Sequence, residues 1–256
     1  MQGSLDDRAA LSELIADSQA IVHCAGAVRG SSLAQFRRSN LDGTRNLLEA
    51  AADRPANVRL LMISSLAARE PQLSWYAQSK REGENLVTSS DGDWCVLRPP
   101  AVYGPGDEEM QAVFASMRQG LALVPGSVAA RNSLIHVTDL VAAMLACLEA
   151  ADAGSQVLYA CDGKPGGYDW KELAEIAATV FERRVRTLRV PGPLLDTFAA
   201  VNLSLARLTG RAPMLTPLKL KELRFPDWVV DNREITACTG WTPSIGLRQG
   251  LAESAL

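Results

Sequence analysis

The sequence VRLLMISSLAAREPQLSWYAQSK, residues 58–80, joins a short apolar run to a polar segment that favours a helix. Residues 58–64 are apolar on both faces, which is typical of a strand buried inside a parallel sheet. Residues 74–87 predict a helix, and residues 20–25 and 94–97 are two further apolar runs separated by helical patterns. The sequence therefore predicts an α/β fold in which helices cover a parallel sheet.

The organisation of the chain changes after Gly163, where strand patterns give way to a mostly helical region. The most apolar of these helical patterns covers residues 193–208. We therefore predict a first domain over residues 1–163 and a smaller, mostly helical lobe over residues 164–256. Parts of residues 105–130 are expected to fold with the second lobe.

Composition excludes several classes of protein. The 256 residues include 26 Lys and Arg against 29 Asp and Glu, so the net charge of -3 argues against a nucleic-acid partner. No run approaches the roughly 18 apolar residues of a membrane span, and the polar start is unlike a signal peptide. The five cysteines form no CxxC pair, which favours a reduced, cytoplasmic protein. No HExxH motif or Cys/His cluster suggests a metal site.

Tyr76 and Lys80 are the chemically informative pair. They lie four residues apart in a predicted helix, so their side chains share one face. An ammonium beside a phenol stabilises the phenolate and lowers its pKa from an ordinary value of about 10. Such a tyrosine can exchange a proton with an alcohol or a carbonyl. We expect Ser65, at the preceding strand end, to hold the same substrate oxygen, in preference to Ser64.

A tyrosine and a lysine at this spacing also occur by chance, usually as an aromatic side chain near a solvated lysine. Here a Ser-Ser strand end precedes the pair, and the segment LRPPAVYGPG, residues 97–106, follows it. Those parts in that order favour a functional site.

The ordered series resembles the extended short-chain dehydrogenase/reductase family of NAD(P)-dependent epimerases, dehydratases and sugar or sterol dehydrogenases. Ser65, Tyr76 and Lys80 match the catalytic Ser-Tyr-Lys set of that family. The resemblance runs over nearly the whole chain, and other family patterns are matched by residues 23–26, 39–48, 97–106, 134–140 and 239–243.

The resemblance implies a Rossmann-like sheet with a C-terminal substrate lobe, and it implies roles for single residues. Tyr76 would be the general acid/base, Ser65 would orient the reacting oxygen, and Lys80 would lower the tyrosine pKa and hold the nicotinamide ribose. The implied cofactor is NAD or NADP, which carries the hydride. It is expected to contact Ala25, Gly26, Ser64, Tyr76, Lys80, Pro99, Pro100 and Val102.

One family element is absent from the sequence. No GxGxxG or GxxGxxG motif occurs, although the family binds the pyrophosphate at such a turn. Residues 3–7, GSLDD, resemble an element that follows the third strand in the family. We therefore expect the chain to lack about two βα units, with residues 20–25 left as an unpaired sheet edge and with weak cofactor binding. Either a longer, active protein or a shortened homologue explains this pattern, and we favour the first.

The substrate and the outcome of the reaction stay open at this level. Ala101 occupies a position where nucleotide-sugar epimerases commonly have Asn, and residues 193–201 are apolar, so both sugar-derived and apolar small molecules are candidates. A serine hydrolase is excluded, because GxSxG is missing and both histidines lie in predicted strands. The rival hypothesis is a binding or structural subunit without activity. The resemblance also implies a homodimer through the helices that hold Asn40 and Tyr76.

Overall fold

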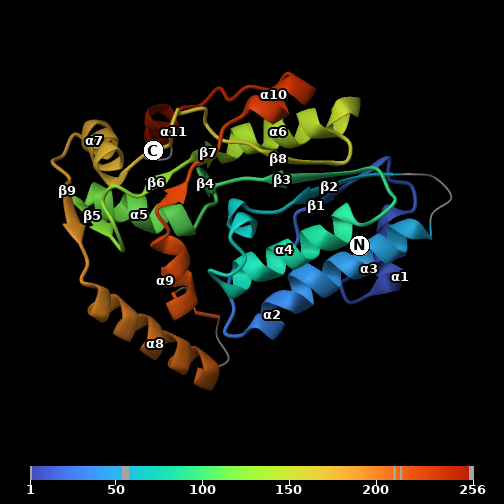
Figure 1. The fold of residues 1–256 in the computed structure, drawn as a ribbon, viewed down its shortest axis with the longest axis horizontal. Helices are drawn as coiled ribbons and strands as arrows, with labels where there is room; N and C mark the ends of the chain where they lie inside the picture. The colour runs from blue at the N-terminus through green and yellow to red at the C-terminus, as the bar shows by residue number, and fades with distance from the viewer. Residues whose placement is uncertain (1, 54–57, 210–211, 214, 254–256) are drawn as a thin grey trace.

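The computed structural model describes residues 2–53, 58–209, 212–213 and 215–253 (Figure 1). In this part of the chain the central sheet has four parallel strands in the order β1-β2-β3-β8. They are β1 (Ala20–His23), β2 (Arg59–Ile63), β3 (Trp94–Arg98) and β8 (Gln156–Tyr159). The predicted α/β class and its parallel sheet are confirmed.

Helices cover both faces of this sheet, which explains why its strands are apolar on both sides. Leu60 and Met62 of β2 pack against α1 (Arg8–Ile15), α3 (Gly43–Ala52) and α4 (Trp75–Thr88). Leu61, between them, belongs to the core under α6 (Val137–Glu149) and α10 (Arg233–Thr239). Figure 1 shows the two helical layers on opposite sides of the strands. Alternate residues of one strand therefore fill two separate cores.

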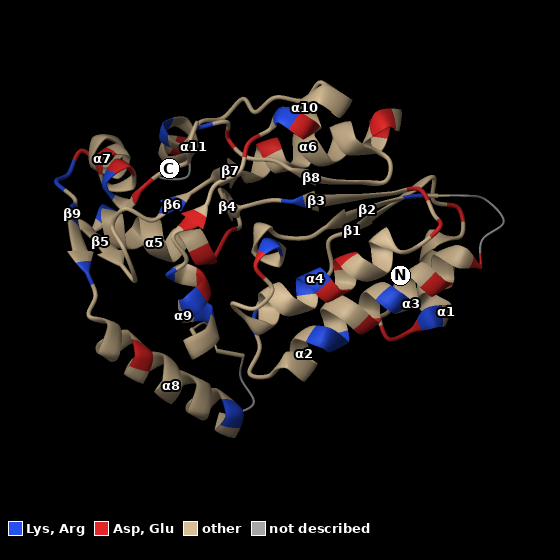
Figure 2. Cartoon of the chain, viewed as in Figure 1, with Lys and Arg blue, Asp and Glu red and all other residues tan. Residues whose placement is uncertain are grey.

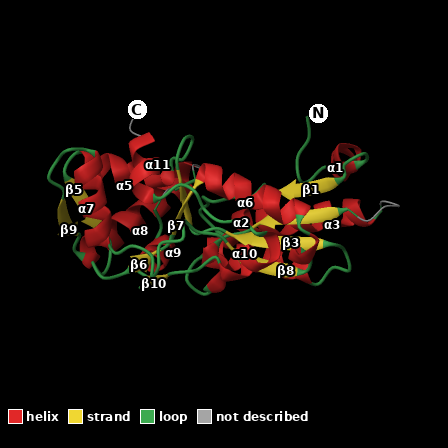
Figure 3. Ribbon diagram, turned by 90° about the horizontal axis from the view of Figure 1, so that it is seen from above, coloured by secondary structure: helices red, strands yellow, loops and turns green. Residues whose placement is uncertain are grey.

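A second group of elements packs around its own core. It contains α5 (Glu109–Arg118), α7 (Trp170–Val180) and α11 (Leu247–Glu253), which bury Met117, Ala177 and Leu251. Three parallel strand pairs accompany them: β4 (Ala101–Tyr103) with β7 (Leu134–His136), β5 (Leu121–Val124) with β9 (Arg186–Arg189), and β6 (Arg131–Asn132) with β10 (Asp227–Trp228). Figure 3 shows this group beside the central sheet along the long axis of the molecule.

Two helices, α8 (Gly192–Thr209) and α9 (Pro217–Leu223), pack against each other. In Figure 1 they lie on the side of the molecule where α2 (Leu33–Arg37) and the first turn of α4 are found. Thr216 caps α9 by accepting a bond from the Lys219 backbone N–H, and Pro217 occupies the first turn, where its missing N–H costs nothing.

β1 is an edge strand within the described residues, as the sequence predicts. It pairs with β2 alone, and the Val22 side chain is 41% exposed. The proposed division at Gly163 stays a prediction, although α10 of the later region packs on the central sheet.

Candidate active site

The candidate site lies where the parallel strands β1, β2 and β3 end. Gly26 follows β1, Ser64 and Ser65 follow β2, and Pro99 follows β3. Because these strands are parallel, their carboxyl ends meet at one edge of the sheet, where open α/β sheets bind their ligands.

Tyr76 is placed by the start of α4. The Ser74 hydroxyl caps this helix by accepting a hydrogen bond from the Ala77 backbone N–H at 3.0 Å. The cap fixes where the helix begins, so that Tyr76 lies in its first turn and Lys80 one turn later. The predicted helix over residues 74–87 is therefore present, and the pair shares one face as expected.

The Ser65 hydroxyl lies near the Tyr76 phenol. Burial is the largest influence on Tyr76, and it raises the pKa of the phenol because the phenolate loses solvation. The neighbouring Ser65 hydroxyl acts in the opposite direction and lowers this pKa. The Ser65 oxygen also accepts from the Ala67 backbone N–H at 3.1 Å, which holds the side chain in place.

The side chain of Lys80 extends from α4 to the end of β2. Its ammonium donates to the Ile63 carbonyl oxygen at 2.7 Å, and the side chain is buried. Burial lowers the pKa of Lys80 to about 8, because the charged ammonium is poorly solvated there. The Glu84 carboxylate acts in the opposite direction and raises the pKa of Lys80, which favours its charged form at this strand end.

The structure corrects the expectation that the Tyr76 phenol is unusually acidic. Sequence reasoning predicted that Lys80 lowers the Tyr76 pKa, whereas the pKa is raised and the cation that opposes this rise is Lys219. The Lys80 ammonium is instead directed to the Ile63 carbonyl. The Lys219 ammonium lies 5.5 Å from the centroid of the Tyr76 ring. Burial of the phenol thus outweighs the opposing charge of Lys219.

Lys219 and Glu222 are the site residues that the sequence did not reveal. Both lie on α9, and the Lys219 ammonium pairs with the Glu222 carboxylate at 2.6 Å. Glu222 also accepts a 2.6 Å hydrogen bond from the Ser74 hydroxyl, so the cap of α4 is tied to α9. A Lys and a Glu three residues apart in a short helix carry no local sign of a partner more than a hundred residues earlier.

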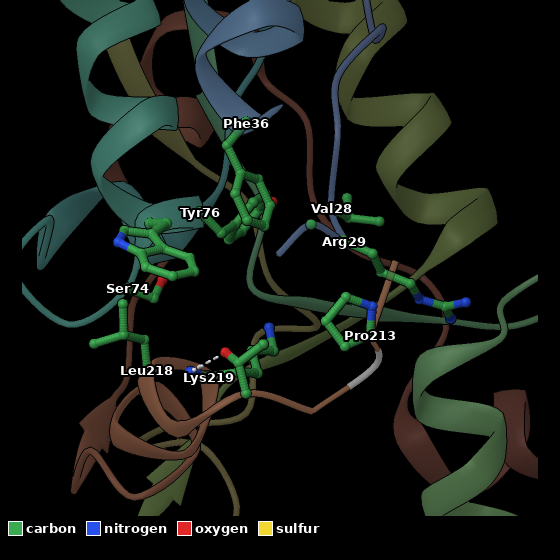
Figure 4. A pocket seen from close by; sticks show the side chains of 11 residues that line it. Val28, Arg29, Phe36, Ser74, Tyr76, Pro213, Leu218 and Lys219 are labelled. Carbon is green, nitrogen blue, oxygen red and sulfur yellow. Dashed lines mark hydrogen bonds between the residues drawn. The ribbon is translucent and has the colours of Figure 1, made fainter. Parts of the chain in front are cut away.

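A small cavity of about 20 Å³ lies beside Tyr76 and Lys219 (Figure 4). Its lining combines apolar side chains of the first domain, such as Val28 and Phe36, with Pro213 and Leu218 of the later region. Figure 4 shows that α9 closes one side of it. A cavity of this size holds about one water molecule, so a substrate that reaches Tyr76 has to displace this lining.

Asn40 ties the loop after β1 to the site. Its side-chain oxygen accepts from the Ala27 backbone N–H at 2.7 Å, and its amide nitrogen donates to the Ser79 hydroxyl at 2.8 Å. A Cβ atom on Gly26 would lie 2.8 Å from the Asn40 oxygen, so this close approach requires glycine. Gly26 is thereby held near the Lys80 ammonium.

The residues expected to contact the cofactor differ in their exposure. Ala25 and Gly26 are exposed, whereas Pro99 and Pro100 are buried and Val102 packs against the core under α6. The Ser64 hydroxyl donates to Glu84, a buried carboxylate that also accepts from Arg98 at 2.9 Å. The Ser64 side chain is thus engaged by the buried Glu84–Arg98 pair, and any contact of Ser64 with a cofactor stays a prediction.

The described residues contain neither a cluster of metal ligands nor a membrane-spanning helix. In that part of the chain no group of three or more His, Cys, Asp and Glu side chains could hold a metal ion. Among the helices of the described ranges, none has the length and apolar character needed to cross a membrane.

Comparison with known proteins gives consistent matches. The sequence model of the NAD dependent epimerase/dehydratase family matches residues 1–160. A ceramide reductase of Caulobacter vibrioides is 37% identical over 226 residues, which cover 88% of this chain and 70% of the relative. A UDP-glucose 4-epimerase of Vibrio cholerae is 25% identical over 266 residues, covering 92% of this chain and 75% of the relative.

Solved structures agree on the fold. RMD from Pseudomonas aeruginosa, complexed with NADPH, superposes with a TM-score of 0.72 at 21% identity, over 100% of this chain and 89% of that one. A UDP-glucose 4-epimerase from Thermotoga maritima, with UDP-glucose, gives a TM-score of 0.74 at 17% identity, over 99% and 82%. At these identities the likeness concerns the fold alone.

Proposed function

The chain belongs to the NAD dependent epimerase/dehydratase family, and on that premise we propose that it transfers hydride between a nicotinamide cofactor and the carbonyl or alcohol carbon of an apolar, ceramide-like molecule. The observation that carries the proposal is the placement of the Ser65 hydroxyl near the Tyr76 phenol at the end of β2, with the Lys80 ammonium beside the same strand end.

In the proposed reaction Tyr76 is the general acid/base. Because burial raises its pKa, the phenol is protonated near neutral pH and can donate its proton to a carbonyl oxygen that becomes an alcohol. In the reverse direction the phenolate accepts that proton. Ser65 donates to the same oxygen and holds it in line with the phenol.

The residues at the strand ends fit a nicotinamide cofactor. A lysine ammonium has three donors, and the described residues supply an acceptor to Lys80 for one of them, at the Ile63 carbonyl. The remaining donors suit the ribose hydroxyls, and the exposed Ala25 and Gly26 leave the edge of the sheet accessible. The cofactor, NAD or NADP, would supply or accept the hydride.

An apolar substrate is favoured over a sugar nucleotide by part of the cavity lining. Val28, Phe36 and Leu218 contribute hydrocarbon there, beside the polar side chains of Arg29, Ser74, Thr216 and Lys219. Ala101 offers no amide where epimerases commonly have one. The ceramide reductase is also more similar to this chain than the UDP-glucose 4-epimerase. A sugar-derived substrate remains the second candidate.

The test is a fluorescence titration with NADH and NADPH, followed by assays with a short-chain keto analogue of ceramide and with UDP-glucose. We expect saturable cofactor binding and consumption of cofactor with the keto lipid. If UDP-glucose is converted and the keto lipid is not, the proposed substrate changes from a lipid to a sugar nucleotide. No saturation at millimolar cofactor would contradict the proposal and favour a binding or structural subunit.

A homodimer through the helical segments that hold Asn40 and Tyr76, and a cytoplasmic location, complete the proposal. The mass in solution, measured by light scattering, tests the dimer.

A further inference from the structure

Helix α8 carries an unpartnered apolar stripe on its outer face. Five large side chains recur every three or four residues, and their exposed fractions are 63%, 60%, 52%, 54% and 83% for Leu194, Phe198, Val201, Leu205 and Leu208. The opposite face is buried through Ala199 and Ala206, on the side where α8 packs against α9. Isolated exposed leucines are ordinary, but a continuous stripe along one 18-residue helix indicates an interaction surface.

The charges around the stripe have one dominant sign. Residues 182–209 contain two acidic side chains, Glu182 and Asp196, and five arginines, whereas the whole chain has a net charge of -3. Asp196 is paired with Arg224 at 2.8 Å. All five arginines are exposed, and none forms an ion pair with a described residue: Arg183, Arg184, Arg186, Arg189 and Arg207. Figure 2 shows Lys and Arg in blue at β9 and at the C-terminal end of α8.

We propose that α8 lies on the surface of an anionic lipid bilayer, with its apolar stripe at the acyl boundary and the arginines of residues 183–207 at the phosphate headgroups. An amphipathic helix with cations beside a Leu and Phe face binds membranes in this way. With 18 residues it is about 27 Å long and lies in the membrane plane. The inference rests on the proposed apolar substrate, which such a membrane would contain.

A second copy of this chain is the other conceivable occupant, and the charges disfavour it. In a symmetric dimer the same patch faces itself. Pairing α8 with α8 would cover the stripe, but it would bring no anionic partner to the five arginines, because the one acidic residue of α8, Asp196, is already paired with Arg224. An anionic bilayer offers acyl chains to the apolar stripe and phosphate groups to the arginines.

Vesicle flotation of the full chain tests the proposal. We expect it to float with vesicles of phosphatidylcholine and phosphatidylglycerol, and much less with phosphatidylcholine alone. Phe198→Ser with Leu205→Ser should reduce the partition coefficient about tenfold or more, because two apolar anchors are lost. Arg186→Gln with Arg189→Gln should reduce it by about tenfold on the anionic vesicles.

Leu145→Ser is the matched control. Leu145 on α6 and Leu205 on α8 are both 54% exposed, so the control removes an equally exposed leucine from a different surface. It should leave flotation unchanged, and circular dichroism should show that all variants are folded.

Three results would overturn the proposal: no flotation of the unaltered chain, equal loss in Leu145→Ser, or a dimer mass that Phe198→Ser with Leu205→Ser converts to monomer. Flotation needs neither cofactor nor turnover. A chain that floats but fails to bind NADH would therefore refute the proposed function alone, and an active chain that does not float would refute this inference alone.

Discussion

Tyr76 belongs to α4, but the charges that act on it come from elements later in the chain. Lys219 favours its phenolate, whereas Glu222 and Glu109 oppose it, and the nearby Ser65 hydroxyl acts to lower its pKa. The sequence identified Ser65 and Tyr76 because both belong to short segments with recognisable spacing. The charges that act on the phenol come from α5 and α9, and packing alone brings them there. Such contacts leave no pattern in a single sequence.

At the residue scale, removing the charge of Lys219 or that of Glu222 should move the pH dependence of the rate in opposite directions. Ketone reduction needs the protonated phenol, so its rate falls as the pH rises through the Tyr76 pKa. Lys219→Met removes a cation that favours the phenolate, so the Tyr76 pKa rises and the fall should move to higher pH. Glu222→Gln removes an anion and should move it downward.

The measurement is kcat between about pH 8 and about pH 12 for both variants, with ketone substrate in excess, because the raised Tyr76 pKa lies above its ordinary value of about 10. Shifts of one sign in both variants would indicate a general loosening of α9 and contradict the electrostatic account.

At the element scale, α4 is held against the chain that precedes α3 by a close backbone contact. A Cβ atom on Gly83 of α4 would lie 2.3 Å from the Asn40 carbonyl oxygen. Asn40 belongs to a π-helical turn, Arg38–Asp42, that joins α2 to α3. The glycine therefore lets α4 approach the turn that places the Asn40 side chain at the active site.

Gly83→Ala should consequently destabilise the protein, although alanine favours an isolated helix by about 1 kcal/mol. The steric conflict should cost about 1–3 kcal/mol and lower Tm by several degrees in a thermal melt. Gly92→Ala is the control, because a Cβ atom there meets nothing within 4 Å. An unchanged or higher Tm in Gly83→Ala would show that the contact does not constrain α4.

The elements of the central sheet could be predicted because each is a short apolar run bounded by polar helical segments. The sequence of residues 31–52 predicts one helix capped by Ser31 or Ser32. Ser32 is the cap, but the π-helical turn interrupts the helix. That turn widens the backbone around Asn40 and depends on packing against α4, so periodicity does not reveal it.

At the scale of the whole molecule, stability should depend on the protonation of one buried histidine. His23 ends β1, and its Nε2 forms a 2.9 Å hydrogen bond with the Thr44 hydroxyl, which itself donates to the Asn40 carbonyl. The ring therefore donates through Nε2–H, and its burial favours the neutral form. Burial, with a smaller effect of Lys80, lowers the pKa of His23 from its ordinary 6.5 to about 4.

The folded pKa is below the unfolded one, so the unfolded chain binds the proton first as the pH falls. Stability from His23 is complete above pH 6.5 and is lost between pH 6.5 and 4, by about 3 kcal/mol. Urea unfolding across that range measures it. In His23→Gln the free energy of unfolding should decrease less over this pH range, and the difference from the original protein should equal the His23 contribution. An identical decrease in both proteins would contradict the assignment.

The central claim is that the Tyr76 phenol exchanges the proton of the reaction, and Tyr76→Phe tests it most directly. Phenylalanine keeps the ring that packs near Phe36, with centroids 6.2 Å apart, and removes only the hydroxyl. Tyr168→Phe, which loses a buried hydroxyl bonded to Asp162 at 2.6 Å, is the control. The account predicts that kcat falls about 10²–10⁴-fold in Tyr76→Phe alone, with NADH affinity unchanged. A Tyr76→Phe enzyme whose kcat stays within about tenfold of the original would contradict it.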